Sequence, residues 1–174
     1  MKIEKIYFDM DGVLADFERG VRELCGLVPP SQNGIHNPHN DDRMWESIRS
    51  IENFYDKLEL IPGAEEMFHA VYDMYGDRCE ILTGVPKPKR GILTAGDDKT
   101  KWMHRLLAKD IKVNIVHRED KPRFCTGKGS ILIDDMENNI RDWKASGGTG
   151  IVHRSAADTL RELQDILEER IVVE

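Results

Sequence analysis

The sequence is poor in the features that define several classes of protein. Its three cysteines, Cys25, Cys79 and Cys125, are an odd number at wide spacing, unlike a zinc site or a disulfide framework. We therefore expect reduced thiols, as in a cytoplasmic protein. No apolar run approaches the ~18 residues of a membrane span. The first residues enter a strand-like stretch directly and do not have the layout of a signal peptide.

A general excess of positive charge is also absent. The net charge of −7 over 174 residues argues against general affinity for nucleic acid or for an anionic membrane. The charge is uneven, however, because residues 87–128 hold twelve Lys or Arg against five Asp or Glu. We expect most of these side chains to be solvated, and one or two of the lysines to face an anionic ligand.

Apolar stretches of strand length alternate with amphipathic stretches of helical length. Strands are predicted at 3–8, 79–83, 113–116, 130–135 and 150–153. Helices are predicted at 18–26, 44–54, 64–75, 99–109, 136–146 and from Ser155 onward. This alternation predicts an α/β protein with a parallel sheet covered on both faces. Residues 17–60 do not follow it and are predicted to be an insertion after the first strand.

Reactive side chains end three of the predicted strands. Asp9 and Asp11 follow the first strand, Thr83 ends the second, and Asp134 and Asp135 end the fourth. Because ligands bind beyond the carboxyl ends of parallel strands, we expect these groups to meet at one edge of the sheet. Four carboxylates there favour a hard cation with oxygen ligands, and Mg²⁺ fits better than Ca²⁺. The alternative for Asp134 and Asp135 is that they are helix N-terminal acids.

Such a site is suited to phosphoryl transfer. A carboxylate can attack a phosphoryl group to give an aspartyl-phosphate. A second acid two residues away can protonate the leaving oxygen and later deprotonate water. The Thr83 hydroxyl and the backbone N–H of Gly84 can hold phosphate oxygens, and a lysine can offset the remaining charge.

The order of these motifs resembles the haloacid dehalogenase-like superfamily of phosphohydrolases. The motifs are Asp9-Met-Asp11-Gly, a strand ending in Thr83-Gly84, a later lysine, and Asp134-Asp135. The resemblance implies a Rossmann-like three-layer parallel sheet with a small helical cap after the first strand. Residues 1–16 and 61–174 would form the catalytic core, and residues 17–60 the cap.

A narrower resemblance is to the 5'(3')-deoxyribonucleotidases and their bacterial relatives. It rests on Asp9-Met-Asp-Gly-Val-Leu-Ala-Asp-Phe17, Trp45-Glu-Ser47, Asn53-Phe-Tyr55, Ile61-Pro-Gly-Ala64, Lys99 before Trp102, and Asp120-Lys121. Two departures stand out. Members close to the mammalian enzymes have Thr-Ser where this chain has Thr83-Gly84, and the segment between Phe17 and Trp45 is shorter here.

This resemblance implies a role for each matching residue. Asp9 resembles the nucleophile and a Mg²⁺ ligand, and Asp11 the general acid/base with its backbone carbonyl on the metal. Asp134 and Asp135 resemble the acidic metal site, where we expect one to bind the metal directly and the other through water. Either of the two is a candidate for the direct ligand.

The remaining positions resemble contacts to the substrate. Thr83, Gly84, Lys121 and Lys99 resemble phosphate-binding residues, with Lys128 and Lys101 as the respective rivals of the two lysines. Phe17 and Trp45 resemble aromatic side chains that enclose the base or sugar, and the alternative is that they belong to the core.

The sequence thus predicts a Mg²⁺-dependent phosphomonoesterase, in particular a 5'-nucleotidase acting on (deoxy)nucleoside monophosphates through an aspartyl-phosphate. One alternative is a phosphatase for sugar phosphates or nucleic-acid ends, and another is a catalytically silent phosphate-binding protein. The expected partner is a small phosphorylated substrate, with neither a membrane nor nucleic acid in general, in a cytoplasmic setting.

Overall fold

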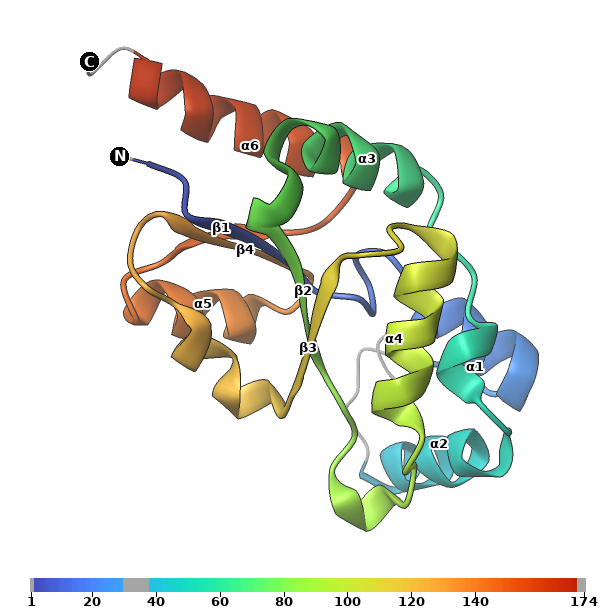
Figure 1. Cartoon of the computed structure of the whole chain (residues 1–174). Helices are drawn as coiled ribbons and strands as arrows, with labels where there is room; N and C mark the ends of the chain where they lie inside the picture. The colour runs from blue at the N-terminus through green and yellow to red at the C-terminus, as the bar shows by residue number, and fades with distance from the viewer. Residues whose placement is uncertain (1, 30–37, 172–174) are drawn as a thin grey trace.

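The computed structural model describes residues 2–29 and 38–171. Its centre is a parallel sheet in the order β3-β2-β1-β4-β5 (Figure 1). The strands are β1 (Lys5–Phe8), β2 (Cys79–Gly84), β3 (Lys112–Val116), β4 (Ser130–Asp134) and β5 (Thr149–Val152). The chain builds outward from β1 to β3 and then returns to the other side of β1 with β4. The topological switch point therefore lies between β1 and β4, which is where ligands bind in such sheets.

Helices cover both faces of this sheet. They are α1 (Phe17–Cys25), α2 (Pro38–Ser50), α3 (Ala64–Tyr75), α4 (Ala95–Leu106), α5 (Glu137–Ala145) and α6 (Ala156–Ile171). Short 3₁₀ helices are η2 (Phe54–Lys57), η3 (Gly76–Arg78), η4 (Pro88–Arg90) and η5 (Arg118–Phe124). Figure 1 shows α3 and α6 together on one side of the sheet and α5 on the other. The predicted α/β Rossmann-like fold is confirmed.

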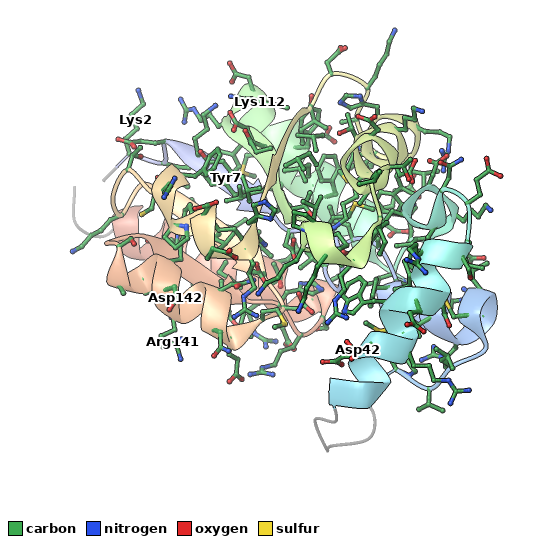
Figure 2. The ribbon with its side chains drawn as sticks, turned by 90° about the horizontal axis from the view of Figure 1, so that it is seen from below. Lys2, Tyr7, Asp42, Lys112, Arg141 and Asp142 are labelled. Atoms are coloured by element: carbon green, nitrogen blue, oxygen red, sulfur yellow. The ribbon has the colours of Figure 1, made fainter. Side chains whose placement is uncertain are left out.

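Alternate residues along the strands supply two separate apolar layers. Ile6 and Phe8 of β1 belong to the larger core, which helices α3, α4 and α6 complete, whereas Tyr7 belongs to the smaller one with Trp143 of α5. In Figure 2, Tyr7 lies inside the molecule while Arg141 and Asp142 point outward from α5. This two-residue period is what a sheet buried on both faces requires.

Two helices, α2 and α4, differ clearly from their predicted bounds of 44–54 and 99–109. Helix α4 begins at Ala95 instead of 99, because the Thr94 hydroxyl contacts Asp98 across the first turn at 2.9 Å. Helix α2 begins at Pro38 instead of 44 and ends at Ser50. A proline is tolerated in a first turn because its missing N–H has no partner there. Asn53, with φ +52°, then turns the chain into η2.

The segment between β1 and α3 leaves and rejoins the core at neighbouring points. The Ile61 N–H donates to the Leu14 carbonyl at 2.8 Å, and the Asp16 N–H donates to the Glu59 carbonyl at 2.8 Å. The described parts of this segment contain α1, α2 and η2. The middle of the predicted insertion, residues 30–37, lies outside the described residues.

Two further observations concern the environment of the chain. Cys25, Cys79 and Cys125 are all free thiols. Within residues 2–29 and 38–171, the helices are too short or too polar for one to cross a bilayer.

Candidate active site

The carboxyl ends of β1, β2 and β4 bring the predicted site residues to one edge of the sheet. Phe8 pairs with Ile81 of β2 on one side and with Ile133 of β4 on the other. The next residue, Asp9, donates its N–H to the Ile133 carbonyl at 2.9 Å. The register between β1 and β4 therefore places Asp9 beside Asp134, at the topological switch point.

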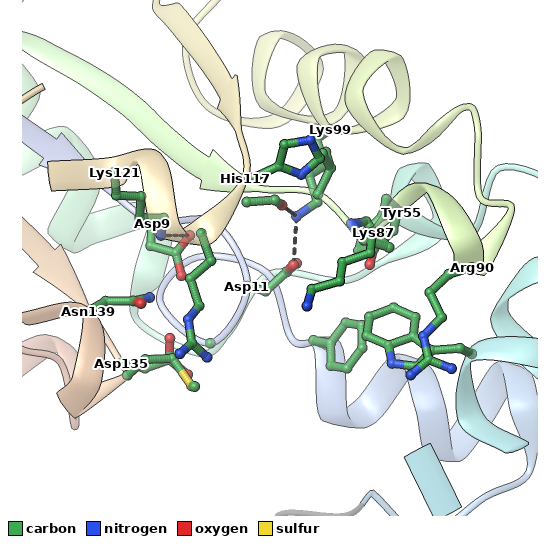
Figure 3. A pocket seen from close by; sticks show the side chains of 18 of the residues that line it. Asp9, Asp11, Tyr55, Lys87, Arg90, Lys99, His117, Lys121, Asp135 and Asn139 are labelled. Carbon is green, nitrogen blue, oxygen red and sulfur yellow. Dashed lines mark hydrogen bonds and ion pairs between the residues drawn. The ribbon is translucent and has the colours of Figure 1, made fainter. Parts of the chain in front are cut away.

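A cleft of about 840 Å³ opens over this edge (Figure 3). Its walls come from the carboxyl edge of the sheet and from the segment between β1 and α3. The predicted residues that line it are Asp9, Asp11, Phe17, Trp45, Gly84, Lys99, Lys121 and Asp135. Thr83 and Asp134 have no exposed surface and lie behind the wall.

Lys121 connects two of the carboxylates at the bottom of the cleft. Its ammonium lies 3.0 Å from Asp9 Oδ1 and 2.8 Å from Asp134 Oδ2. Burial opposes the charge on Lys121, but Asp9 and Asp134 outweigh it and hold the pKa of this ammonium above its ordinary value. Lys121 is therefore a fixed cation beside Asp9, whereas its rival Lys128 is exposed on the surface.

The adjacent acids Asp134 and Asp135 have different surroundings. Both oxygens of Asp134 accept bonds from the protein: Oδ2 from Lys121 and Asn139, and Oδ1 from the Met136 N–H at 2.8 Å. Asp135 instead faces the cleft. Gly12, with φ +81°, allows the backbone to pass Asp135, because a Cβ at this position would lie 2.1 Å from Asp135 Oδ2.

Three carboxylates are crowded together at this point. Atoms of Asp9, Asp134 and Asp135 all lie within 4.8 Å of one another. Burial raises the pKa of Asp9 to about 6; the Lys121 ammonium opposes the rise and the Asp134 carboxylate adds to it. Burial raises the pKa of Asp135 to about 8, and the charges of Asp9 and Asp134 add to the rise. The donor set of hard oxygens and its excess negative charge fit a divalent cation such as Mg²⁺.

Asp11 also lines the cleft, and it pairs with a different lysine, Lys99. The Lys99 ammonium donates to Asp11 Oδ2 at 2.8 Å, to the Thr83 hydroxyl at 3.1 Å and to the Gly84 carbonyl at 2.6 Å. It also lies 4.6 Å from the centre of the Tyr55 ring. Lys99 is thus buried and held by four groups, whereas its rival Lys101 is exposed.

One oxygen of Asp11 lacks a partner. Oδ1 of this carboxylate is buried and, among the described residues, makes no hydrogen bond. A buried acceptor without a donor is costly, so a proton, water or substrate donor at this position would be favourable.

Aromatic rings form the wall beyond Asp11. Phe17 of α1 lies 6.2 Å from the Trp45 ring of α2 and 6.2 Å from the Tyr55 ring of η2, measured between centroids. Phe17 and Trp45 both line the cleft and both also pack against the core. Each of these side chains therefore belongs both to the cleft wall and to the edge of the core, and their contact with a substrate stays a prediction.

A family model matches most of the chain. The model of the 5' nucleotidase, deoxy (pyrimidine), cytosolic type C proteins covers residues 28–168. The chain belongs to this nucleotidase family.

Two human members of the deoxyribonucleotidases are similar in sequence. The mitochondrial 5'(3')-deoxyribonucleotidase is 27% identical over 150 residues, and the cytosolic type is 26% identical over 149 residues. The matches include 75% and 76% of this chain. The chain spans 61% of the mitochondrial relative's length and 71% of the cytosolic relative's length.

Solved structures agree with the fold of this nucleotidase-family chain. A haloacid dehalogenase-superfamily hydrolase from Ehrlichia chaffeensis superposes with a TM-score of 0.59 at 14% identity, over 96% of this chain and 99% of the other. A haloacid dehalogenase-like hydrolase from Streptococcus pneumoniae superposes with a TM-score of 0.55 at 12% identity, over 85% of this chain and 83% of the other. This chain therefore has the fold of these two haloacid dehalogenase-like hydrolases.

Several cleft residues of this family member were not predicted from the sequence as site residues. They are Tyr55, Lys87, Lys89, Arg90, His117, Arg118 and Asn139. The charge excess over residues 87–128 indicated that cations gather in this part of the chain, without indicating which of them reach the cleft. Asn139 had no sequence signal, since its contact with Asp134 depends on how α5 starts.

Proposed function

We propose that this protein is a Mg²⁺-dependent phosphomonoesterase that hydrolyses (deoxy)nucleoside 5'-monophosphates through an aspartyl-phosphate. The observation that carries the proposal is the pairing of two carboxylates with two different lysines in one cleft. Asp9 is paired with Lys121 and Asp11 with Lys99. Such a separation gives one carboxylate for attack and another for proton transfer.

The reaction begins with substrate capture. The phosphate enters between Lys99 and Lys121, with a further donor from the Gly84 backbone. The predicted contact of Thr83 with the phosphate would be indirect, because the buried Thr83 hydroxyl accepts a bond from Lys99 at 3.1 Å. A phosphate oxygen attracts the Lys99 ammonium, which currently donates to Asp11. Loss of this donor makes it easier for Asp11 to hold a proton, because a nearby cation favours the ionised form of a carboxyl group.

Two displacements then follow. An Asp9 oxygen attacks phosphorus, the bond from phosphorus to the ester oxygen breaks, and Asp11 gives its proton to the departing alkoxide. In the second step Asp11 removes a proton from water, the hydroxide attacks the phosphorus, and the bond to Asp9 breaks. Inorganic phosphate leaves, and both carboxylates return to their initial states.

A divalent metal fits the acidic side of the cleft. Asp9, Asp135 and the Asp11 backbone carbonyl would hold it, while Asp134 holds Lys121 and Asn139 in place. Asp135 is the better candidate for the direct ligand, because both Asp134 oxygens are already bonded to protein donors. When bound, the cation would offset negative charge on the carboxylates and on the phosphoryl oxygens.

Residues 17–60 are proposed to act as a small cap. Support comes from the hydrogen-bonded junction at Leu14 and Ile61 and from the rings of Phe17 and Trp45 in the cleft. These rings present π-faces on which a base can stack. The names of the two human relatives support a deoxyribonucleotide as substrate, and free thiols agree with a cytoplasmic setting.

A substrate comparison tests the proposal. Purified protein with Mg²⁺ is assayed for phosphate release from deoxynucleoside 5'-monophosphates and from sugar phosphates, with and without a chelator. We expect a higher kcat/KM on the nucleotides and loss of turnover with the chelator. Equal kcat/KM values on both substrate classes would reject the nucleotidase assignment, and absence of any turnover would favour the silent phosphate-binding alternative.

A further inference from the structure

The two lysines at the bottom of the cleft are already balanced by carboxylates. Lys99 pairs with Asp11, and Lys121 pairs with Asp9 and Asp134. Two more lysines line the same cleft nearer its opening, Lys87 and Lys89, and both are exposed. Within the described part of the chain, neither of these two ammonium groups has a hydrogen bond or an ion pair. Lys87 and Lys89 therefore add positive charge to the cleft that no ion pair within the described residues balances.

The loop that carries Lys87 and Lys89 has only positive charge. The stretch from Val85 to Gly91 contains three cations and no acid. Figure 3 shows Lys87 extending into the cleft on the side of Asp11, with Arg90 farther out on the same loop. At the neighbouring part of the opening, by contrast, Arg118 is followed by the acid Glu119, and both line the cleft. The unbalanced charge is therefore concentrated on the loop after β2.

This loop is also held in place. Pro86 and Pro88 fix two of its φ angles. Val85 donates its N–H to Val116 at 3.0 Å, and the Gly91 N–H closes a turn onto Pro88 at 3.0 Å. Arg90 pairs with Asp42 of α2 at 2.5 Å, which ties the loop to the opposite wall. A loop fixed in this way presents its lysines to a ligand with little loss of backbone freedom on binding.

We propose that Lys87 and Lys89 form a second anion subsite, which binds a second phosphate group of a nucleotide whose first phosphate lies at Asp9. The inference rests on the proposed function, because it extends the same cleft. A volume of about 840 Å³ leaves room for a ligand larger than a nucleoside monophosphate. The substrate class is then a nucleotide that carries a phosphate on its 5' oxygen and another on the 3' side of the sugar.

Binding to a non-hydrolysing variant tests this directly. Asp9→Asn protein with Mg²⁺ is titrated calorimetrically with deoxythymidine 5'-monophosphate, deoxythymidine 3',5'-bisphosphate and a 5'-phosphorylated dinucleotide. The measured quantity is the ratio of the Kd of the monophosphate to the Kd of each doubly phosphorylated ligand. We expect a ratio of about ten, since charge-assisted bonds from two lysines to a phosphate are added.

Variants then test whether Lys87 and Lys89 cause the ratio of Kd values. In the Asp9→Asn background, Lys87→Gln with Lys89→Gln should bring the ratio close to one. The matched control is Lys101→Gln, which removes the same charge from an exposed lysine outside the cleft and should keep the ratio. Tighter binding of the bisphosphate alone indicates a free nucleotide, and tighter binding of the dinucleotide as well indicates a nucleic-acid end. A ratio of one in the Asp9→Asn protein, or a ratio unchanged in the double variant, would overturn the subsite.

The outcome is independent of the proposed activity. If the wild type hydrolyses the monophosphate but Asp9→Asn shows a ratio of one, the subsite fails and the nucleotidase activity stands. If Asp9→Asn binds the bisphosphate tighter through Lys87 and Lys89 but the wild type hydrolyses neither ligand, the activity fails and the subsite stands.

Discussion

Gly84 ends β2 at the place where a phosphate is expected to bind. Its carbonyl accepts a bond from Lys99 at 2.6 Å, and its backbone does not have a positive φ. A Cβ added here would meet no atom closer than the Arg118 nitrogen at 3.7 Å, which is an ordinary contact. A side chain therefore fits at position 84 without backbone strain or a close contact.

We predict that Gly84→Ser binds nucleotide more tightly. The added hydroxyl can donate one hydrogen bond to the phosphate, worth about 1 kcal/mol, which corresponds to a decrease of about fivefold in KM. Steady-state kinetics with a deoxynucleoside 5'-monophosphate measure the change. Gly84→Ala, which adds the Cβ without the hydroxyl, should keep the wild-type KM. An equal KM for the serine and alanine variants would show that the hydroxyl makes no contact.

Substitution of Asp135 tests whether this carboxylate binds the metal. We predict that Mg²⁺ raises the melting temperature of the wild type, because a ligand that binds only the folded state stabilises it. At pH 7 without metal, Asp135→Asn should melt higher than the wild type, because folding raises the pKa of Asp135 to about 8 and this costs stability at every pH above its unfolded value of 3.8. Asp135→Asn should also lose most of the rise in melting temperature that Mg²⁺ gives the wild type. A full response in Asp135→Asn would place the cation elsewhere.

The acidic residues of the site could be predicted because strand ends and parallel topology determine their positions. The different tasks of Asp134 and Asp135 could not be predicted, since they depend on which way each carboxylate turns after β4. The structure directs Asp134 inward to Lys121 and Asn139, and Asp135 toward the cleft. The contact between Tyr55 and Lys99 could not be predicted either, because it depends on how η2 packs against α4 in the folded protein.

At the scale of elements, Glu80 of β2 connects three strands. Its carboxylate lies 2.7 Å from Lys5 of β1 and accepts a bond from the Asn114 amide of β3 at 3.0 Å. Burial opposes the charge on Glu80, but the bonds from Lys5 and Asn114 outweigh it and hold the pKa of this carboxyl below its ordinary value. The edge strand β3 is thereby attached to the centre of the sheet at the end away from the cleft.

We predict that Glu80→Gln lowers the free energy of unfolding by about 1–3 kcal/mol at pH 7, because charge-assisted hydrogen bonds are lost. A carboxyl group whose pKa is lowered by folding stabilises the protein above its unfolded pKa of 4.5, and this contribution is lost as the pH falls through the folded pKa. Urea unfolding at pH 7 and below pH 4.5 should therefore show a difference that shrinks in acid. A difference independent of pH would mean that Glu80 acts through packing alone.

The elements themselves were largely predictable, and their ends were not. The two-residue and helical periods of the sequence define each strand and each helix of the core. The start of α4 depends on the side-chain contact between Thr94 and Asp98, and the end of α2 is followed by the left-handed backbone of Asn53. Local contacts of this kind are decided by the folded backbone and do not appear in a pattern of apolar residues.

At the scale of the whole molecule, an ion pair between Arg90 and Asp42 links the loop after β2 to helix α2 across the cleft. Arg90 on the core loop and Asp42 on α2 lie 2.5 Å apart, with the side chains 22% and 62% exposed. An ion pair with this much exposure contributes at most about 1 kcal/mol. It is nevertheless placed to set how far α2, with Trp45, stands from the catalytic edge.

We predict that Arg90→Gln raises the KM for a nucleoside monophosphate by about two- to fivefold, a loss of up to ~1 kcal/mol in binding. Asp42→Asn should also raise the KM. The KM of the double variant should not exceed that of the more impaired single variant, because all three variants lose the same interaction. Steady-state kinetics of the three variants give the coupling. Additive increases in KM would mean that the two residues act separately.

We propose Asp9 as the nucleophile of a Mg²⁺-dependent phosphomonoesterase, and this role can be tested directly. The most direct measurement is the rate of phosphate release from a deoxynucleoside 5'-monophosphate with Mg²⁺ by the wild type, Asp9→Asn and Asp97→Asn. Asp97 is an exposed carboxylate outside the cleft, so its variant controls for the loss of one charge. We expect a fall of at least about 10³-fold for Asp9→Asn, a wild-type rate for Asp97→Asn, and melting curves that show all three proteins folded. A folded Asp9→Asn protein with the wild-type rate would contradict the account.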